Sequence, residues 1–100
     1  MQFLSISQRR KGFAEEAYAG LAEQEMERAR ELYSEGLIRQ IWHRADTPGA
    51  CLLWEAEGEE QVREVWKTFP FAQAGMTEVT LIPLKPYAGF GPAKPPKIKA

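Results

Sequence analysis

The sequence has few of the residue types on which many protein classes depend. Among its 100 residues there is one cysteine, Cys51, which excludes an intrachain disulfide framework and is typical of a reducing cytoplasm. There is a single histidine and no cluster of carboxylates, so we expect no metal site. The formal net charge of −1 provides no field that would attract nucleic acid, and we expect no nucleic-acid partner.

Long hydrophobic runs are absent as well. The first residues, Met-Gln-Phe-Leu-Ser-Ile-Ser, have neither a basic start nor an extended apolar stretch. We therefore expect no signal peptide, no membrane-spanning segment and a cytoplasmic location. A hydrophobic content of 44% over 100 residues is typical of one globular domain.

The distribution of proline and lysine separates a folded part from a tail. Both residue types become frequent near the C-terminal end, where apolar periodicity is lost. Such a composition favours an extended or disordered chain. We expect a domain over residues 1–91 and a tail over residues 92–100.

The remaining pattern alternates between two kinds of element. Period-two apolar segments predict strands, and segments of good helix formers with a spacing of three and four predict helices. Gly36 suits a helix C-terminus, the stretch from Asp46 to Gly49 is typical of a turn, and Pro70 is expected to end a helix. The expected strands are residues 2–7, 37–44, 50–56 and 76–84, and the expected helices are residues 13–35 and 59–69.

This β-α-β-β-α-β order predicts an α+β fold, the ferredoxin-like sandwich of four antiparallel strands with two helices on one face. The expected strands carry apolar residues of both parities. A sheet that is apolar on both sides favours a second copy on the uncovered face, hence a homodimer or a larger homo-oligomer.

Glu25 lies within the apolar stripe of the first predicted helix. At about 100° per residue, Tyr18, Leu21, Ala29 and Leu32 all fall within about 40° of it. A carboxylate placed against a core loses hydration, which raises its pKa and suits it to general acid/base work. The alternative is a structural ion pair with an arginine.

Two cationic candidates follow on the next strand. In regular alternation, Arg39 and His43 share one face. The histidine is a candidate proton shuttle, and the arginine a candidate partner for a carboxylate or an enolate oxygen. The alternatives are a half-exposed strand histidine and a cross-strand pair between Arg39 and Glu55.

The residues around Glu25 and Arg39 resemble the muconolactone delta-isomerase family. The resemblance consists of a helix with a central Glu25, then Glu35-Gly36, Arg39 and Trp42, and later Phe69-Pro70-Phe71 before the last strand. It implies the dimeric α+β barrel and cofactor-free chemistry on a small unsaturated lactone acid. A base removes a proton next to a carbonyl, and the proton returns at another carbon. Glu25 would be the carboxylate, and Arg39 and Trp42 would line the site.

The sequence also departs from that family in two places. His43 stands between Trp42 and Arg44, and Lys85-Pro86-Tyr87 occupies the place of a His-Pro pair. From the candidate residues and the resemblance together, we expect a cofactor-independent isomerase that acts on a small unsaturated lactone or carboxylic acid. Its catalytic residues would be Glu25, His43 and Arg39.

Two other functions stay open. A cyclase or monooxygenase of polyketide type on the same barrel would use Trp42, Trp54 and Tyr87 to line an aromatic pocket. The third possibility is a non-catalytic module that binds a ligand or assembles through the uncovered sheet face.

Overall fold

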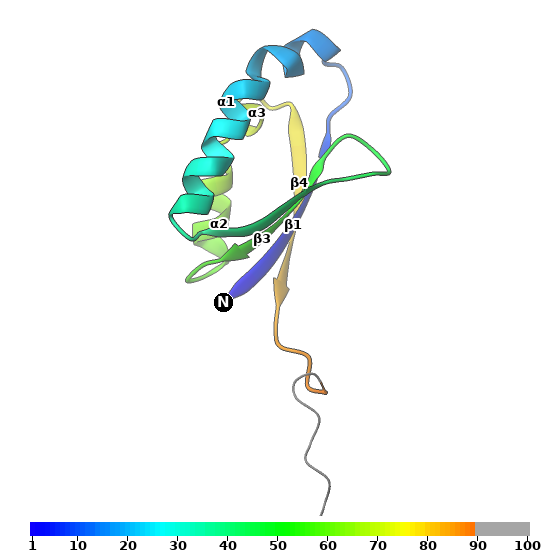
Figure 1. Cartoon of the computed structure of the whole chain (residues 1–100). Helices are drawn as coiled ribbons and strands as arrows, with labels where there is room; N and C mark the ends of the chain where they lie inside the picture. Colours follow the sequence, from blue (N-terminus) through cyan, green and yellow to red (C-terminus); the bar gives the residue numbers. More distant parts are fainter. Residues whose placement is uncertain (90–100) are drawn as a thin grey trace, which may run out of the picture.

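The chain folds as one antiparallel sheet with its helices on one face (Figure 1). The computed structural model describes residues 1–89. Its sheet order is β2-β3-β1-β4, which confirms the predicted ferredoxin-like fold. The elements are β1 (Gln2–Arg9), α1 (Glu15–Ser34), β2 (Ile38–His43), β3 (Ala50–Glu55), α2 (Glu59–Trp66), α3 (Pro70–Gln73) and β4 (Thr77–Leu84). The predicted tail, residues 92–100, lies outside the described residues.

Helix α1 has a well-defined end at Gly36. This glycine has φ +83°, a conformation that costs a residue with a Cβ. The Gly36 N–H donates to the carbonyl of Tyr33 and the Leu37 N–H to that of Leu32, at 3.1 and 3.0 Å. This pair of bonds is a Schellman motif, which satisfies the last carbonyls of the helix and turns the chain into β2.

The core lies between the helices and the inner face of the sheet. Trp54 of β3 and Phe3 of β1 are at its centre, at 0% and 1% exposure. The Trp54 indole N–H donates to the hydroxyl of Ser5 at 2.9 Å, so the buried polar atoms of both residues are paired. The core is completed by Leu32, Ile38, Leu52, Ala56, Val62 and Phe69.

Strand β2 contains a bulge that the sequence pattern did not reveal. Ile38 pairs with Trp54 but Gln40 pairs with Leu53, so an extra residue, Arg39, lies between them. Strict alternation is lost there, and Ile38 shares the inner face with His43 although the two are an odd number of positions apart. The regular alternation from which we predicted that Arg39 and His43 share one face is therefore absent, and that prediction is wrong.

The second helical segment is also divided differently from the prediction. Helix α2 ends at Trp66, and Pro70 does not terminate it but begins the short helix α3. A proline suits the first position of a helix because no N–H is needed there. The result is a sharp corner that turns Phe69 into the core and Phe71 toward α1.

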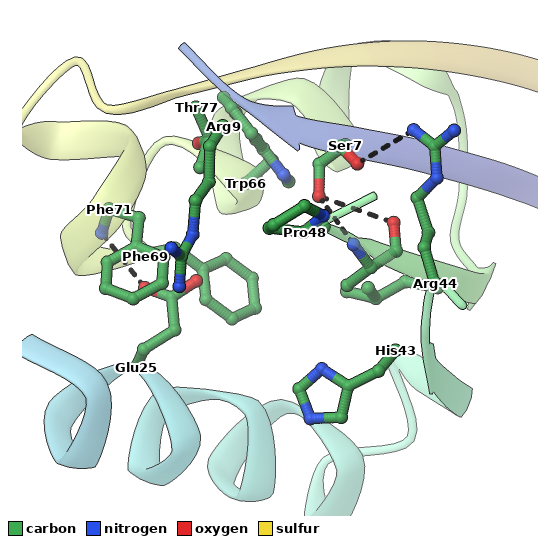
Figure 2. Close-up of a pocket in the computed structure, with 13 residues that line it drawn as sticks. Ser7, Arg9, Glu25, His43, Arg44, Pro48, Trp66, Phe69, Phe71 and Thr77 are labelled. Atoms are coloured by element: carbon green, nitrogen blue, oxygen red, sulfur yellow. Dashed lines mark hydrogen bonds between the residues drawn. The ribbon is translucent and has the colours of Figure 1, made fainter. Parts of the chain in front are cut away.

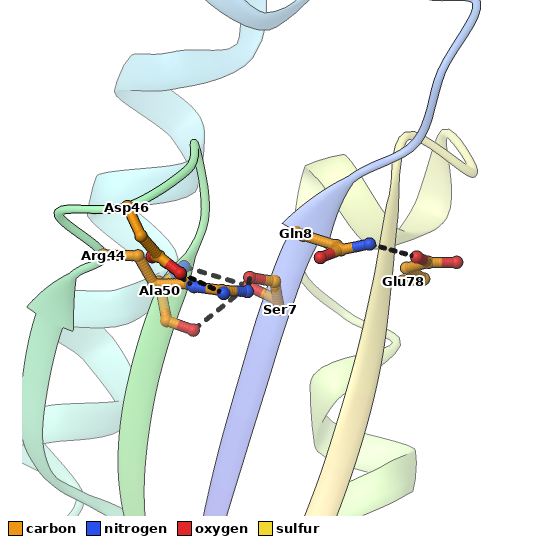
Figure 3. A network of polar contacts seen from close by, with 6 residues as sticks. All are labelled: Ser7, Gln8, Arg44, Asp46, Ala50 and Glu78. Atoms are coloured by element: carbon orange, nitrogen blue, oxygen red, sulfur yellow. Dashed lines mark hydrogen bonds and ion pairs between the residues drawn. The ribbon is translucent and has the colours of Figure 1, made fainter.

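The turn between β2 and β3 is fastened to the end of β1 (Figure 3). Backbone pairing of β1 with β3 reaches Ile6, and beyond it the Ser7 hydroxyl bonds the N–H and the carbonyl of Ala50 at 3.2 and 3.3 Å. Arg44 forms two bonds with Asp46, at 3.0 and 2.8 Å, and donates a third to the Ser7 carbonyl at 3.3 Å. The turn is thus held by side chains where the ladder has ended.

The outer face of the sheet is uncovered and largely apolar. The register places the side chains of Leu4, Ile6, Trp42, Leu53, Ile82 and Leu84 on this face. Pro83 lies on β4, which is an edge strand as predicted. Among the described residues, no helix is long and apolar enough to cross a membrane. The two-sided apolar pattern is confirmed, and the dimer it favours stays a prediction.

Gly49 provides a test of how tightly the turn lies on β1. A Cβ at this position would overlap the carbonyl oxygen of Ser7, whereas a Cβ at Gly20 in α1 would meet nothing within 4 Å. We expect Gly49→Ala to lower the free energy of unfolding by about 1–3 kcal/mol. Gly20→Ala, the control, should raise it by about 0.5–1 kcal/mol. Urea unfolding measures both, and equal effects would contradict the close approach.

Candidate active site

A cavity of about 380 Å³ lies between the inner face of the sheet and the helices, near the β2–β3 turn (Figure 2). Strands, helices and the turn all contribute to its walls. Its lining combines one carboxylate, two guanidinium groups, an imidazole and several aromatic rings. The lining residues are Ser7, Arg9, Glu25, His43, Arg44, Pro48, Gly49, Ala50, Leu52, Trp66, Phe69, Phe71 and Thr77.

Glu25 is the carboxylate of this cavity. It projects from α1 between Tyr18 and Leu32, which are buried as the stripe predicted. Its Oε1 accepts a hydrogen bond of 2.9 Å from the backbone N–H of Phe71. That N–H is in the first turn of α3, where no carbonyl of the helix itself is available. The bond fixes one carboxylate oxygen, and Oε2 accepts no bond from residues 1–89.

The electrostatic state of Glu25 follows from its surroundings. Burial raises its pKa, and the hydrogen bond from Phe71 opposes part of that rise. Within residues 1–89, Glu25 belongs to no ion pair, so the predicted alternative of a structural salt bridge does not describe this glutamate. A carboxylate with a raised pKa and one free oxygen is suited to general acid/base work.

Arg9 supplies a cation to the same cavity from the opposite wall (Figure 2). It is the last residue of β1 and lies on the inner face, paired with Thr77 of β4. The first strand was predicted to end at residue 7, so Arg9 fell outside it, directly before two further basic residues and a glycine. The alternation Phe3, Ser5, Ser7 was the signal that could have placed Arg9 on the inner face.

Arg44 also lines the cavity, but its charge is already engaged. Its bonds to Asp46 raise its own pKa and lower that of Asp46. With the Ser7 carbonyl as a further acceptor, the guanidinium holds the turn in place. Arg9 also pairs with an exposed carboxylate, that of Glu15 at 2.8 Å, but it has no second acceptor among residues 1–89. We therefore regard Arg44 as a residue that fixes the turn and Arg9 as the cation that serves the cavity.

His43 reaches the cavity from the end of β2. Its register partner is Ala50, and both line the cavity together with the turn residues Pro48 and Gly49. The imidazole is exposed at the rim and faces α1 (Figure 2). Two predicted catalytic residues, Glu25 and His43, are therefore brought together in one cavity.

Arg39, the third predicted catalytic residue, is not among the lining residues. It is the extra residue of the bulge, is exposed, and its Nε donates to the Gly36 carbonyl at 3.0 Å. The alternative pair with Glu55 does not form either, because Glu55 bonds the N-terminal ammonium of Met1 at 2.8 Å. That bond lowers the pKa of Glu55, with a smaller contribution from Arg39.

The aromatic residues that the sequence suggested are replaced by others. Trp54 is buried in the core, Trp42 lies on the outer face at 47% exposure, and Tyr87 is 76% exposed. None of the three lines the cavity of the single chain. Its aromatic walls come instead from α2 and the corner into α3, as Trp66, Phe69 and Phe71.

The cavity offers no ligand set for a metal. Across residues 1–89, no three histidine, cysteine, aspartate or glutamate side chains gather in a way that could hold an ion. The groups that face the cavity can instead exchange a proton and bind an anionic oxygen.

Comparisons with known proteins identify the family of this chain. The chain belongs to the muconolactone delta-isomerase family, whose sequence model matches residues 1–89. This finding bears out the resemblance stated from Glu25, Gly36 and Trp42. A comparison with curated proteins gives no significant match.

Two solved structures share the fold. Muconolactone isomerase aligns with a TM-score of 0.74 at 16% identity, covering 90% of this chain and 94% of its own. The 5-chloro-2-hydroxyhydroquinone dehydrochlorinase of Burkholderia phenoliruptrix AC1100, solved with 2,5-dihydroxybenzoquinone, aligns at 0.72 and 20% identity, covering 85% and 94%. These likenesses show the fold, that of the dimeric α+β barrel.

The raised pKa of Glu25 predicts a pH-dependent stability. A folded-state pKa above the unfolded value stabilises the protein at low pH, and this contribution is lost as pH rises through the folded value. Replacing Glu25 with Gln removes the ionisation and keeps an oxygen for the Phe71 N–H. We expect Glu25→Gln to gain stability relative to the parent as pH rises from the unfolded value of about 4.3 through the raised folded value.

Urea unfolding at several pH values measures this difference. Glu27→Gln, which removes an exposed carboxylate from the same helix, is the control for the loss of one negative charge. A stability difference for Glu25→Gln that stays flat with pH would contradict the prediction.

Proposed function

We propose that this chain is a cofactor-independent enzyme that moves a proton on a small unsaturated lactone or carboxylic acid, in the manner of an isomerase. The observation that carries the proposal is the half-buried Glu25, which faces a cavity with Arg9 and His43 and forms no ion pair within residues 1–89. Membership in a family named for a lactone isomerase supports it.

Glu25 is the group that takes the proton. Its carboxylate removes a proton from the carbon next to a carbonyl, and the electron pair of the broken C–H bond moves onto the carbonyl oxygen. Phe71 holds Oε1 through its N–H, so that the other oxygen is directed at the substrate. The same carboxyl group then returns the proton to a different carbon, which shifts the double bond and restores the base.

Arg9 is the group that stabilises the developing negative charge. In our proposal it takes the role that the sequence suggested for Arg39, since Arg9 lines the cavity and Arg39 does not. A fixed guanidinium can accept an enolate oxygen or a carboxylate through two parallel N–H bonds. Such a preorganised cation contributes several kcal/mol to the transition state in a site that excludes water.

His43 is proposed as the proton relay at the rim. Its exposed ring connects the cavity with solvent and lies on the same inner sheet face as Ala50. A histidine in this place can carry a proton between the substrate and water when the transfer through Glu25 alone is geometrically unfavourable.

A dehydrochlorination is the second candidate reaction. It begins with the same proton abstraction, after which chloride leaves with its bonding electrons and a double bond forms. The structural likeness to a dehydrochlorinase favours testing it, although that likeness shows the fold alone. Release of chloride from a chlorinated hydroquinone distinguishes it from isomerisation.

The first prediction concerns Glu25 in turnover. Because a positioned acid or base contributes about 10²–10⁴-fold, Glu25→Gln should lower kcat by that factor while the circular dichroism spectrum is retained. Isomerisation of muconolactone, followed by NMR in deuterated water, measures both the double-bond shift and the exchange of the transferred proton. Undiminished turnover in this variant would sink the proposal.

The second prediction separates the two arginines. Arg9→Gln should lower kcat/KM by about 10²-fold or more, since it removes the cation that faces the substrate. Arg39→Gln removes an equal charge from the exposed bulge and should change kcat/KM by less than about threefold. The reverse order would restore the role that the sequence suggested for Arg39.

A further inference from the structure

Arg9 and Glu25 face one cavity with opposite charges, yet they do not pair. Opposite charges in a partly desolvated space attract one another strongly, so the absence of this pair from residues 1–89 requires a cause. Arg9 forms its ion pair with Glu15 instead, at 2.8 Å between Nη1 and Oε1. Glu15 is in the first turn of α1, is not a lining residue of the cavity, and has a side chain that is 73% exposed.

Tyr18 provides the second restraint on Arg9. The guanidinium carbon lies 4.0 Å from the centre of the Tyr18 ring, a cation–π arrangement. Tyr18 is itself immobilised at 2% exposure, since its hydroxyl donates to the Met76 carbonyl at 2.7 Å. Its ring also meets the edge of Phe71, with 5.4 Å between ring centres.

The same Phe71 holds Glu25 from the other direction. Its ring contacts Tyr18, and its backbone N–H binds Oε1 of Glu25. The base and the cation are therefore attached to one rigid aromatic pair, each on its own side. Their separation is built into the packing and does not depend on a bound molecule.

We propose that Glu15 and Tyr18 are positioning residues that hold the Arg9 guanidinium off Glu25, so that an anionic oxygen of the substrate binds between the two. This inference rests on the proposed function for its catalytic meaning, but the restraint itself concerns only the free protein. Without it, Arg9 would collapse onto Glu25 and neutralise the base.

The other charged groups around Glu25 do not account for a change in its titration when Glu15 is replaced. His43 lies at the rim, and Arg44 is bound to Asp46 and to the Ser7 carbonyl. From α2, α3 and β4, the lining residues are Trp66, Phe71 and Thr77, which carry no charge. Arg44 would keep its bond to the Ser7 carbonyl after the loss of Asp46, whereas the loss of Glu15 leaves the Arg9 side chain with no hydrogen-bond acceptor among residues 1–89.

The test is a titration of the Glu25 carboxyl carbon by NMR in the intact chain without substrate. Glu15→Gln frees Arg9 to approach Glu25, and an approaching cation favours the ionised form. We expect the acid dissociation constant of Glu25 to rise at least threefold. Glu16→Gln removes the same charge from the next residue of the same helical turn and should leave the titration unchanged.

Two further variants show whether the effect passes through Arg9. In an Arg9→Gln background, Glu15→Gln should no longer change the titration of Glu25, because the cation that moves is gone. Tyr18→Leu removes the ring beneath Arg9 and should act like Glu15→Gln. Tyr18→Phe keeps the ring but loses the bond to Met76, so it should shift the titration less than Tyr18→Leu does. If Tyr18→Leu fails to fold, the Glu15 variants alone still test whether Arg9 is held away from Glu25.

The inference is overturned if Glu15→Gln and Glu16→Gln shift the titration equally, or if the shift persists without Arg9. The proposed function fails separately, if Glu25→Gln leaves turnover unchanged. With substrate present, Glu15→Gln should lower kcat and move the acid limb of its pH profile to lower pH, because the ionised form of Glu25 is then favoured. Glu16→Gln should reproduce neither change.

Discussion

The hydrogen bond between the Phe71 N–H and Glu25 joins the two parts of the structure on which the cavity depends. It connects the middle of α1 with the start of α3, segments that are 46 residues apart. Pro70 makes the bond possible, because the helix that begins there has a free N–H at the next residue. Without that donor the carboxylate would be half-buried with nothing to orient it.

The surroundings of Glu25 explain why the pKa of this carboxylate is raised. Burial raises its pKa while a single neutral donor compensates in part, and the cation is attached elsewhere. A full ion pair would have stabilised the carboxylate and removed its basicity. In the proposed function, the cavity thus combines a weakly compensated carboxylate with a cation that is held apart from it.

The sequence predicts the fold well because strand and helix periodicity, Gly36 and the β2–β3 turn all agree. It also identifies Glu25, since one charged residue within an apolar stripe is visible from spacing alone. The position of Arg39 could not be predicted, because a bulge shifts the alternation of a strand by one residue and is not visible in the hydrophobic pattern.

The remaining errors have a similar origin. The place of Arg9 in the cavity could not be predicted, because a charged residue at the end of a strand has the same sequence pattern as the start of a loop. Trp54 and Trp66 cannot be ranked by composition, since both are apolar aromatics on predicted elements. Only packing shows that Trp54 fills the core and that Trp66 borders the cavity.

The bulge at Arg39 and the proline at Pro83 have one consequence in common. They lie on β2 and β4, the two edge strands of the sheet, where unpaired backbone groups would otherwise invite another strand. An irregular edge with an exposed charge and an edge that lacks an N–H are both poor templates for strand addition. Growth of the sheet from chain to chain is thereby discouraged, and copies of this protein that associate are directed to meet face to face.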